Sequence, residues 1–281
     1  MKPILKYPGG KQRELKHYLK YIPKFEKYYE PFLGGGATYF ALQPKKARLG
    51  DINNRLIKFY LNLVNNYPTV KDEISHLSKE YEENRQIEGG DSRRNSDMYY
   101  RVRDMFNGKA EPTLDFATIY YVINHLAYSG IIRYNKKGEY NIAYGWYAHL
   151  NSSLLTDEHY ELLKTAEINK ESYEKSFEQA SSKDFIFLDP PYDCTYSSYG
   201  NLQFIGDFKE DEHRKLAQDF KNLSAKALMI IAATDLTKEL YAPYVQDEYR
   251  KNYSLNIKNR FQLGAEHLVV ANYDIREIER S

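Results

Sequence analysis

The sequence predicts an α/β fold with a doubly wound, mostly parallel β-sheet, into which a helical domain is inserted. Three observations support this prediction. Short apolar runs alternate with helical patterns in the C-terminal part, a glycine cluster directly follows the first strand candidate, and the middle of the chain is helical in period. A chain of 281 residues has room for about two domains.

The strands are expected towards both ends of the chain. The apolar runs that indicate them lie at 28–32, 47–50, 185–188, 227–233 and 267–275. Helical patterns at 210–223 and 235–244 lie between the later runs. Since parallel neighbours need a crossover connection that is usually helical, this alternation favours a parallel sheet.

The middle of the chain shows helical periods without strand runs of similar quality. These periods cover 56–63, 70–84, 96–106 and 113–128. The polar stretch 84–96, with two adjacent glycines and two adjacent arginines, is expected to be a loop. We therefore interpret 55–151 as an inserted domain, which leaves 1–54 and 152–281 for the sheet domain.

Composition excludes several classes of protein. With 42% hydrophobic and 15% aromatic residues, the chain is not expected to be disordered. A lone cysteine, Cys194, excludes an internal disulfide and a thiolate cluster, and we expect no metal site. No apolar run approaches the ~18 residues of a spanning helix, so we expect a cytoplasmic protein that has no membrane partner.

The charges are balanced overall but unevenly distributed. Lys and Arg number 40 and Asp and Glu 39, which gives no general sign of a nucleic-acid-binding protein. However, the first 27 residues and 249–265 are basic, whereas 153–193 is acidic. Each run can be a solvated surface, yet their separation also suits a cleft that faces a polyanion.

The glycine-rich segment 30–37 follows the first strand candidate and is expected to open a helix. Glycines there allow a ligand to approach the backbone, and Asp51, at the end of the next strand, is placed to bind ribose hydroxyls. The segment lacks the Lys-Ser/Thr ending of a phosphate loop. Because Glu30 and Asp51 flank it, the site favours a cationic, phosphate-free nucleoside, and S-adenosylmethionine fits. A plain turn is the alternative.

The sequence Asp189-Pro190-Pro191-Tyr192 ends the apolar run 185–188. Two prolines hold the segment extended, so the Asp189 carboxylate and the Pro190 carbonyl can both accept hydrogen bonds from one aromatic amine. The ring of Tyr192 offers a face on which a base can stack. Such positioning would activate a poorly nucleophilic amine towards a methyl donor; an ordinary turn at a strand end is the alternative.

At this point the chain resembles the Dam-like, alpha-group DNA adenine N(6)-methyltransferases. Four blocks carry the resemblance in the family's order, namely 5–11, 30–37 with Asp51, 129–145, and 189–192. The resemblance implies a Rossmann-like methyltransferase sheet and a helical target-recognition domain that carries a β-hairpin. It also implies methyl transfer from S-adenosylmethionine to the N6 amine of an adenine flipped out of double-stranded DNA.

The resemblance assigns site residues position by position. The implied catalytic residues are Asp189, Pro190, Pro191 and Tyr192. The implied cofactor-binding residues are Tyr7, Lys11, Glu30, Phe32, Gly34, Gly36, Asp51, Ser172, Tyr173 and Asp189. The implied DNA-binding residues are Lys6, Tyr128, Ser129, Arg133, Asn135, Lys136, Lys137, Asn141 and Arg260.

The hairpin residues also suit DNA on physical grounds. Asn135-Lys136-Lys137-Gly138 is a turn with two cations at its tip, and Arg133 and aromatic residues flank it, which fits phosphate contact and groove insertion. Arg260 lies in a second basic stretch that would cover the flipped base or the backbone. Ala143 stands where GATC-specific members usually have proline, so the resemblance does not carry the target sequence over.

Other functions remain open from the sequence alone. The same amine geometry suits a cytosine N(4)-methyltransferase, and a protein-glutamine methyltransferase or a catalytically silent DNA-binding protein are further alternatives. Cys194 has no histidine nearby in the sequence and is expected to be a packing residue. We expect a monomer, whose further partner would be a cognate restriction endonuclease in the same system.

Overall fold

The computed structural model describes residues 1–87, 93–130, 133–192, 208–251 and 265–279. The described residues form two compact units, which we treat separately. The helical unit comprises Met1–Gly10 and Asn53–Ile168, and the sheet unit comprises Lys11–Ile52 together with the described residues from Asn169 onwards. The predicted sites at Cys194 and Arg260 lie outside the described residues.

The sheet has seven strands among the described residues, in the order β3-β2-β1-β4-β5-β7-β6. The strands are β1 (Tyr28–Glu30), β2 (Ala47–Asp51), β3 (Ala166–Lys170), β4 (Phe185–Leu188), β5 (Lys226–Ala232), β6 (Val245–Lys251) and β7 (Ala265–Ala271). β1 pairs in parallel with β2 and β4, and β4 with β5, whereas β7 is antiparallel to both its neighbours. The predicted α/β fold with a mostly parallel sheet is confirmed.

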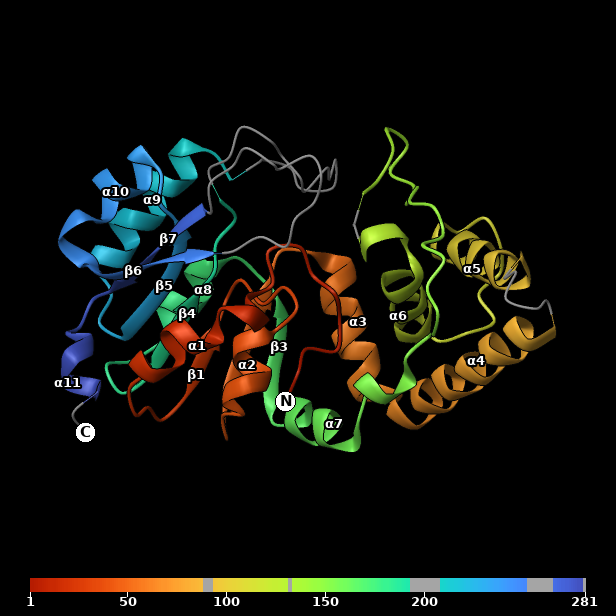
Figure 1. Ribbon diagram of the computed structural model, residues 1–281. Helices are drawn as coiled ribbons and strands as arrows, with labels where there is room; N and C mark the ends of the chain where they lie inside the picture. The colour runs from red at the N-terminus through yellow and green to blue at the C-terminus, as the bar shows by residue number, and fades with distance from the viewer. Residues whose placement is uncertain (88–92, 131–132, 193–207, 252–264, 280–281) are drawn as a thin grey trace. The chain divides into compact units, whose positions relative to one another are not determined.

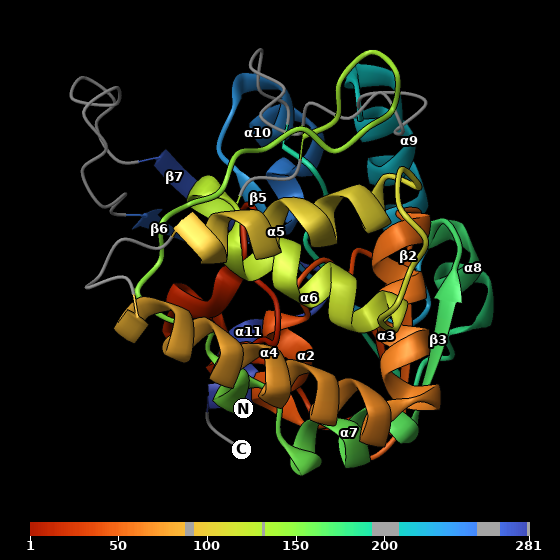
Figure 2. The ribbon, with the colours of Figure 1, turned by 90° about the vertical axis from the view of Figure 1, so that its right-hand side faces the viewer.

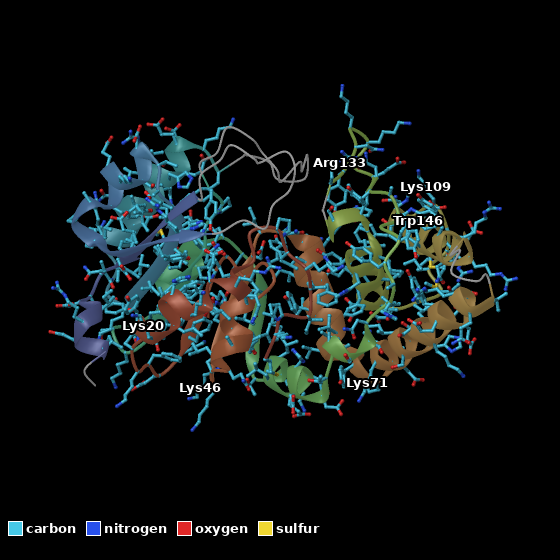
Figure 3. The ribbon with its side chains drawn as sticks, in the orientation of Figure 1. Lys20, Lys46, Lys71, Lys109, Arg133 and Trp146 are labelled. Atoms are coloured by element: carbon cyan, nitrogen blue, oxygen red, sulfur yellow. The ribbon has the colours of Figure 1, made fainter. Side chains whose placement is uncertain are left out.

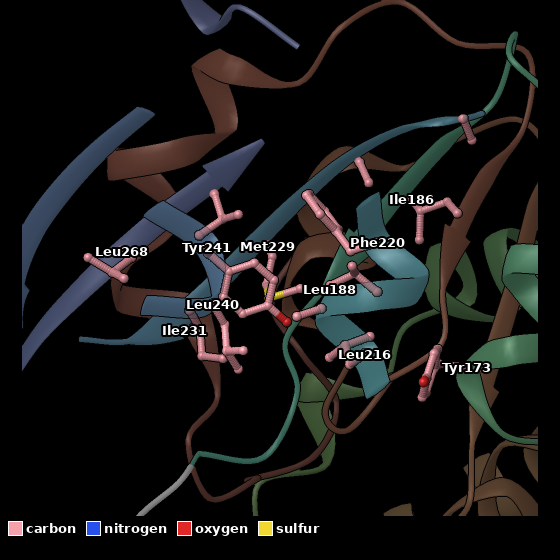
Figure 4. Close-up of a cluster of buried hydrophobic side chains, with 14 of the residues drawn as sticks. Tyr173, Ile186, Leu188, Leu216, Phe220, Met229, Ile231, Leu240, Tyr241 and Leu268 are labelled. Carbon is pink, nitrogen blue, oxygen red and sulfur yellow. The ribbon is translucent and has the colours of Figure 1, made fainter. Parts of the chain in front are cut away.

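Side chains alternate across the sheet and fill both of its faces. Ile186 and Leu188 point to one face, where they join a cluster with side chains of the helices α8 (Tyr173–Gln179), α9 (Glu210–Lys221) and α10 (Asp235–Tyr241) (Figure 4). Phe187 points to the other face, where its ring stacks on Tyr18 of α1 at a centroid distance of 5.2 Å. A fully buried run of apolar residues is therefore required in β4, as the sequence has it.

Short helices surround the sheet in its unit (Figure 1). They are the 3₁₀ turns η1 (Lys11–Arg13), η2 (Leu19–Tyr21) and η5 (Ala242–Tyr244), and the α-helices α1 (Leu15–Tyr18), α2 (Ala37–Leu42), α8 (Tyr173–Gln179), α9 (Glu210–Lys221), α10 (Asp235–Tyr241) and α11 (Ile275–Glu279). The glycine-rich segment opens α2, as predicted.

The helical unit is built around α6 (Phe116–Leu126), in which every residue from Ala117 onwards is buried. The other elements are α3 (Asn54–Asn65), α4 (Tyr67–Ile87), α5 (Arg93–Phe106), η3 (Tyr128–Gly130), η4 (Ser152–Leu154) and α7 (Asp157–Lys164). Helices α3, α4 and α5 all contact α6 (Figure 2). Because α6 is largely apolar and buried on all sides, it is stable only when its neighbours cover it.

Local signals in the sequence set the starts of these helices. The side chain of Asn53 accepts hydrogen bonds from the backbone NH groups of Arg55 and Leu56 and so caps α3. Asp115 caps α6 in the same way, through the NH of Ala117 at 2.7 Å. Pro68 lies in the first turn of α4, where no intrahelical donor is needed.

Three expectations about elements need correction. The loop expected at 84–96 is helical at both ends, because α4 continues to Ile87 and α5 begins at Arg93. The strand expected at 267–275 ends at Ala271, and α11 starts at Ile275. The side chain of Asp274 accepts a hydrogen bond from the NH of Arg276 at the start of this helix. Strands β3 and β6 were not expected at all.

Candidate functional site

The sheet order reverses between β1 and β4, which are paired with Tyr28 opposite Phe185. In open α/β sheets, ligands bind outside the carboxyl ends of the strands at such a point. Two predicted segments leave the sheet here: Glu30 leads into the glycine-rich segment after β1, and Asp189 follows β4. The topology therefore brings together two blocks that are about 150 residues apart in the sequence.

Lys11 forms an ion pair with Asp189, and its Nζ lies 2.5 Å from Oδ1 of the carboxylate. The lysine side chain is 2% exposed and that of the aspartate 22%. Burying an ammonium is costly unless an opposite charge is close, so Asp189 accounts for the burial of Lys11. The same ammonium lies 4.9 Å from the ring centre of Tyr192. Lys11 thus lies against both the first and the last residue of the Asp189–Tyr192 block.

The carboxyl of Glu30 is buried beside this pair, with an exposure of 2%. Its Oε2 accepts hydrogen bonds from the hydroxyl of Tyr28 at 2.8 Å and from the NH of Tyr39 at 3.0 Å. Burial raises the pKa of Glu30 to about 8; the Tyr28 and Tyr39 hydrogen bonds oppose this shift and the charge of Asp189 adds to it. A positively charged group near Glu30 would favour its ionised form.

The glycine-rich segment is tied to Asp51 at the end of β2. The NH of Gly34 donates to Oδ2 of Asp51 at 3.0 Å, and Asp51 is 8% exposed. Gly36 has φ +66° at the start of α2, and a side chain there would press against Phe40. The glycine is required by this left-handed conformation and by the packing of α2.

Of the predicted pair Ser172-Tyr173, the tyrosine lies beside Phe32. Ser172 precedes α8, and the ring of Tyr173 stacks on that of Phe32 with centroids 5.8 Å apart. The hydroxyl of Tyr173 donates to Asp219 at 2.7 Å, so its ring is held in place from the α9 side. All predicted cofactor residues except Tyr7 thus belong to the sheet unit.

A buried polar cluster next to Tyr192 was missed by the sequence reasoning. Oε2 of Glu14 accepts a hydrogen bond from the hydroxyl of Tyr249 at 2.7 Å and lies 3.6 Å from Nδ1 of His267. The ring of His267 packs against that of Tyr192 at 5.3 Å, and His17 stacks on Tyr249 at 4.4 Å. The available signal was polar residues inside apolar runs, such as His267 before Leu-Val-Val.

The segment predicted to form a β-hairpin lies in the helical unit, where its described residues form a turn closed by the isolated bridge Tyr134–Tyr140 and no regular strands. The side chain of Asn135 accepts hydrogen bonds from the NH groups of Lys137 and Glu139, and Gly138 takes φ +76°. These bonds build the turn, so Asn135 shapes it and leaves the exposed cations at its tip.

Arg133 and Asn141 face each other across this hairpin. Nε of Arg133 donates to the side-chain oxygen of Asn141 at 3.1 Å, and both side chains are exposed. The remaining donors of the guanidinium can still reach a base edge or a phosphate. Figure 3 labels Arg133 in the stick view.

Lys6 contacts the base of the same hairpin region. Its Nζ donates to the carbonyl of His125 at 2.8 Å and lies 3.8 Å from the ring centre of Tyr147. Gly130 packs on its aliphatic stem, and burial lowers the pKa of Lys6. The ammonium of Lys6, which was predicted to contact a base, thus already donates one hydrogen bond within the protein.

Two aromatic side chains are exposed near this region. Tyr128, which was predicted to enter the base stack, is 62% exposed, and Ser129 follows it with φ +58°. Trp146, labelled in Figure 3, is also 62% exposed and has φ +54°. The sequence reasoning did not single out Trp146, although it is the lone tryptophan of the chain.

Tyr7 belongs to the helical unit, where its carbonyl accepts a hydrogen bond from the NH of Gly10 at 3.0 Å. Within the described ranges, no three His, Cys, Asp or Glu side chains gather into a group that could hold a metal ion. None of the helices in the described part is long and apolar enough to cross a membrane.

Comparison with known proteins agrees with this geometry. Residues 7–257 match the model of the D12 class N6 adenine-specific DNA methyltransferases. The type II methyltransferase M.CviBI of Paramecium bursaria Chlorella virus NC1A is 34% identical over 286 residues, which cover 97% of this chain and all of the relative. The DNA adenine methylase of Salmonella typhimurium is 29% identical over 246 residues, or 85% of this chain and 83% of the relative.

The match decides between the functions that the sequence left open. A family of adenine-specific DNA methyltransferases accounts for both the sheet and the hairpin described above. The alternatives, which were cytosine methylation, glutamine methylation and a silent DNA-binding protein, are not supported. S-adenosylmethionine is the general methyl donor of DNA methyltransferases. The chain belongs to the D12 class N6 adenine-specific DNA methyltransferases.

Proposed function

We propose that the sheet unit binds S-adenosylmethionine and methylates adenine, and that the helical unit recognises the target in duplex DNA. The observation that carries the proposal is the Lys11–Asp189 pair, which lies where the sheet order reverses and next to a buried Glu30. In this proposal residues 1–10 and 152–168, which lie in the helical unit, go with target recognition.

The surroundings of Asp189 fit a cationic cofactor. Glu14 and Glu30 are both buried. Besides burial, their charges and that of Asp189 raise the pKa of the Tyr18 hydroxyl, so the three carboxyls lie in one region. Lys11 is the cation that pairs with Asp189. A ligand with an ammonium and a sulfonium would balance these carboxylates. S-adenosylmethionine supplies a methyl group on such a positively charged sulfur.

The remaining cofactor contacts follow from the same elements. Glu30 and Asp189 would hold the ammonium of the methionine moiety, and Asp51 the ribose hydroxyls, because carboxylates accept hydrogen bonds from both. The stacked rings of Phe32 and Tyr173 offer an apolar surface for the adenine. Tyr7, Lys11, Gly34, Gly36 and Ser172 complete the assignment.

The Asp189–Tyr192 block would position the target adenine. Oδ2 of Asp189 and the carbonyl of Pro190 accept the two hydrogens of the amine, and Pro191 keeps the segment extended because its φ is fixed. Lys11 holds the carboxylate in place through Oδ1. Tyr192 stacks on the flipped base, so the amine is aligned before the methyl group is transferred.

The hairpin of the helical unit would contact DNA. Arg133 is assigned to a base edge, Lys136 and Lys137 to phosphates, and Tyr128 with Ser129 to the gap in the base stack. Lys6, Asn135 and Asn141 support this surface, and Arg260 is assigned to the flipped base or the backbone. Flipping one base costs a few kcal/mol, which the inserted side chains would offset.

We propose a monomer that acts in the cytoplasm. The relatives include type II methyltransferases, so a cognate restriction endonuclease of the same target sequence is the partner that they suggest. Sequencing of adenine methylation in DNA from a host that expresses the chain would identify the target. If the host has no such endonuclease, an extract of its cells should leave unmethylated DNA that contains the target uncut.

The decisive experiment replaces Asp189 with alanine. Asp189→Ala should abolish incorporation of the methyl group, while DNA affinity stays within a few-fold of the wild type, because Asp189 belongs to the sheet unit and the hairpin does not. Nucleoside analysis of the wild-type product should show N6-methyladenine. Retained turnover in the variant would refute the role of Asp189 as acceptor of the amine hydrogens.

A further inference from the structure

The cluster of Glu14, Tyr249 and His267 is built from three distant parts of the chain. Glu14 follows η1, whereas Tyr249 and His267 come from the neighbouring strands β6 and β7, where they are directly paired. Their rings stack with centroids 5.5 Å apart. All three side chains are buried, with exposures of 3%, 9% and 0%.

Packing alone does not explain this cluster. A carboxylate and an imidazole in a protein interior cost free energy even when they are paired, and apolar side chains of similar volume are often as stable or more so. The fold would therefore be served equally well by apolar residues at Glu14 and His267. Burial also raises the pKa of Tyr249, and Glu14 adds to that shift. The tyrosine hydroxyl therefore keeps its proton and donates a hydrogen bond to the carboxylate.

The cluster reaches the catalytic block through Tyr192. The ring of Tyr192 contacts His267 at 5.3 Å, and the Lys11 ammonium lies 4.9 Å from the ring centre. Lys11 is in turn fixed by Asp189 at 2.5 Å. Tyr192 is thus held by one neighbour that is anchored in the cluster and by another that is anchored in the ion pair.

We propose that Glu14, His267 and Tyr249 are positioning residues that set the orientation of the Tyr192 ring for the incoming adenine. The proposal rests on the proposed function, in which that ring stacks on the flipped base. Glu14 holds Tyr249 by accepting its hydrogen bond and lies 3.6 Å from Nδ1 of His267. His267 packs between the rings of Tyr249 and Tyr192, so the position of the cluster sets that of the Tyr192 ring. A stacking face that is correctly set beforehand lowers the barrier to transfer without changing how tightly DNA binds.

The chain offers a matched pair of substitutions for the test. Tyr249→Phe removes the hydroxyl that donates to Glu14, whereas Tyr241→Phe removes a hydroxyl that is also buried in the sheet unit but has no hydrogen-bond partner among the described residues. Single-turnover methyl transfer on a duplex with one target should slow about tenfold in Tyr249→Phe and stay unchanged in Tyr241→Phe. The dissociation constants for the duplex and for S-adenosylmethionine should stay within twofold in both.

A double-mutant cycle separates a positioning role from a purely structural one. His267→Leu should slow transfer in the wild-type background, but should have no further effect in Tyr192→Ala, because the cluster then has no ring left to orient. His267→Gln, which keeps a polar side chain near Glu14, should slow methyl transfer less than His267→Leu does.

Two results would overturn the proposal. The first is an equal rate loss from His267→Leu with and without Tyr192, and the second is an unchanged rate in Tyr249→Phe. If instead Tyr192→Ala alone leaves the rate unchanged, the stacking role in the proposed function fails, and the two failures are therefore distinguishable. Melting temperatures of all variants show whether each remains folded.

Discussion

The Nζ of Lys11 lies 2.5 Å from Oδ1 of Asp189, and the lysine side chain is only 2% exposed. Removing the ammonium would leave the carboxylate without the cation that fixes its orientation. Lys11→Gln should therefore slow single-turnover methyl transfer by at least about tenfold, while DNA affinity hardly changes. Arg13→Gln, an exposed neighbour in η1, is the control. A rate within twofold of the wild type would show that the ion pair does not position Asp189.

The raised pKa of Glu30 makes cofactor binding depend on pH. The carboxyl has an ordinary pKa of 4.5 and one of about 8 in the folded chain, so it is protonated at neutral pH before a cation arrives. Binding of S-adenosylmethionine should release a proton near pH 7, and its affinity should rise with pH and level off above about pH 8.

Calorimetry in buffers of different ionisation enthalpy measures this proton release. Glu30→Gln should abolish both the release and the slope, whereas Glu178→Gln, an exposed carboxyl of the sheet unit, should leave them unchanged. The same shift predicts that stability without cofactor falls as pH rises from about 4.5 to 8, because the folded state binds the extra proton in this range. An affinity that does not vary with pH would place the cation elsewhere.

The two kinds of hairpin cation should differ in their effects on DNA binding. Arg133→Ala should reduce discrimination against altered targets by about 1–3 kcal/mol. Lys137→Ala, at the exposed tip, should weaken binding to all sequences alike and lower the salt dependence by about one counterion. Competition titrations at several salt concentrations distinguish these outcomes. Identical behaviour of the two variants would contradict the division into base and phosphate contacts.

The lone tryptophan provides a direct probe of the DNA-facing surface. Trp146 is 62% exposed, so a collisional quencher such as acrylamide should reach it easily in the unbound protein. If the face of the helical unit near Tyr128 contacts DNA, a saturating duplex should shield the indole and reduce this quenching. Quenching that stays the same at saturation would move the DNA away from Trp146.

Two glycines should differ in the cost of a methyl group. A Cβ on Gly145 would clash with the ring of Tyr147 and lie 3.0 Å from the backbone of Ala127, so Gly145→Ala should destabilise the chain by about 1–3 kcal/mol. Gly138 has open space around it but φ +76°, so its alanine variant should cost about 1 kcal/mol through backbone strain alone. Urea denaturation gives both values; the reverse order would contradict the packing described at Gly145.

The sequence predicted the buried elements of the sheet far better than its edges. β4 was predicted with its observed bounds because all four side chains are buried and apolar. β3 and β6 were missed, and they are the two edge strands of the sheet. Their sequences, Ala-Glu-Ile-Asn-Lys and Val-Gln-Asp-Glu-Tyr-Arg-Lys, are polar, as expected for strands that pair on one side only, so hydrophobic periodicity gives no signal there.

The candidate site shows the same division between local and long-range information. The glycine-rich segment, Asp51 and Asp189 could be singled out in the sequence because each is a local motif at a strand end. The cluster around Glu14 was not, because its members meet only when β6, β7 and the segment after η1 have come together. No local pattern marks Lys11 as the partner of Asp189 either, since 178 residues separate them.

The chain leaves the sheet after β2 and returns to it in β3, and the NH of Glu171, directly after β3, donates to the carbonyl of Asp51 at 3.2 Å. The long stretch between these residues therefore starts and finishes at the same hydrogen bond. A segment with adjoining ends can be exchanged without pulling the flanking backbone apart. If the inserted segment recognises the target, as proposed, exchanging it between Asn53 and Ala166 would keep both β2 and β3 in the sheet and is a route to altered sequence specificity.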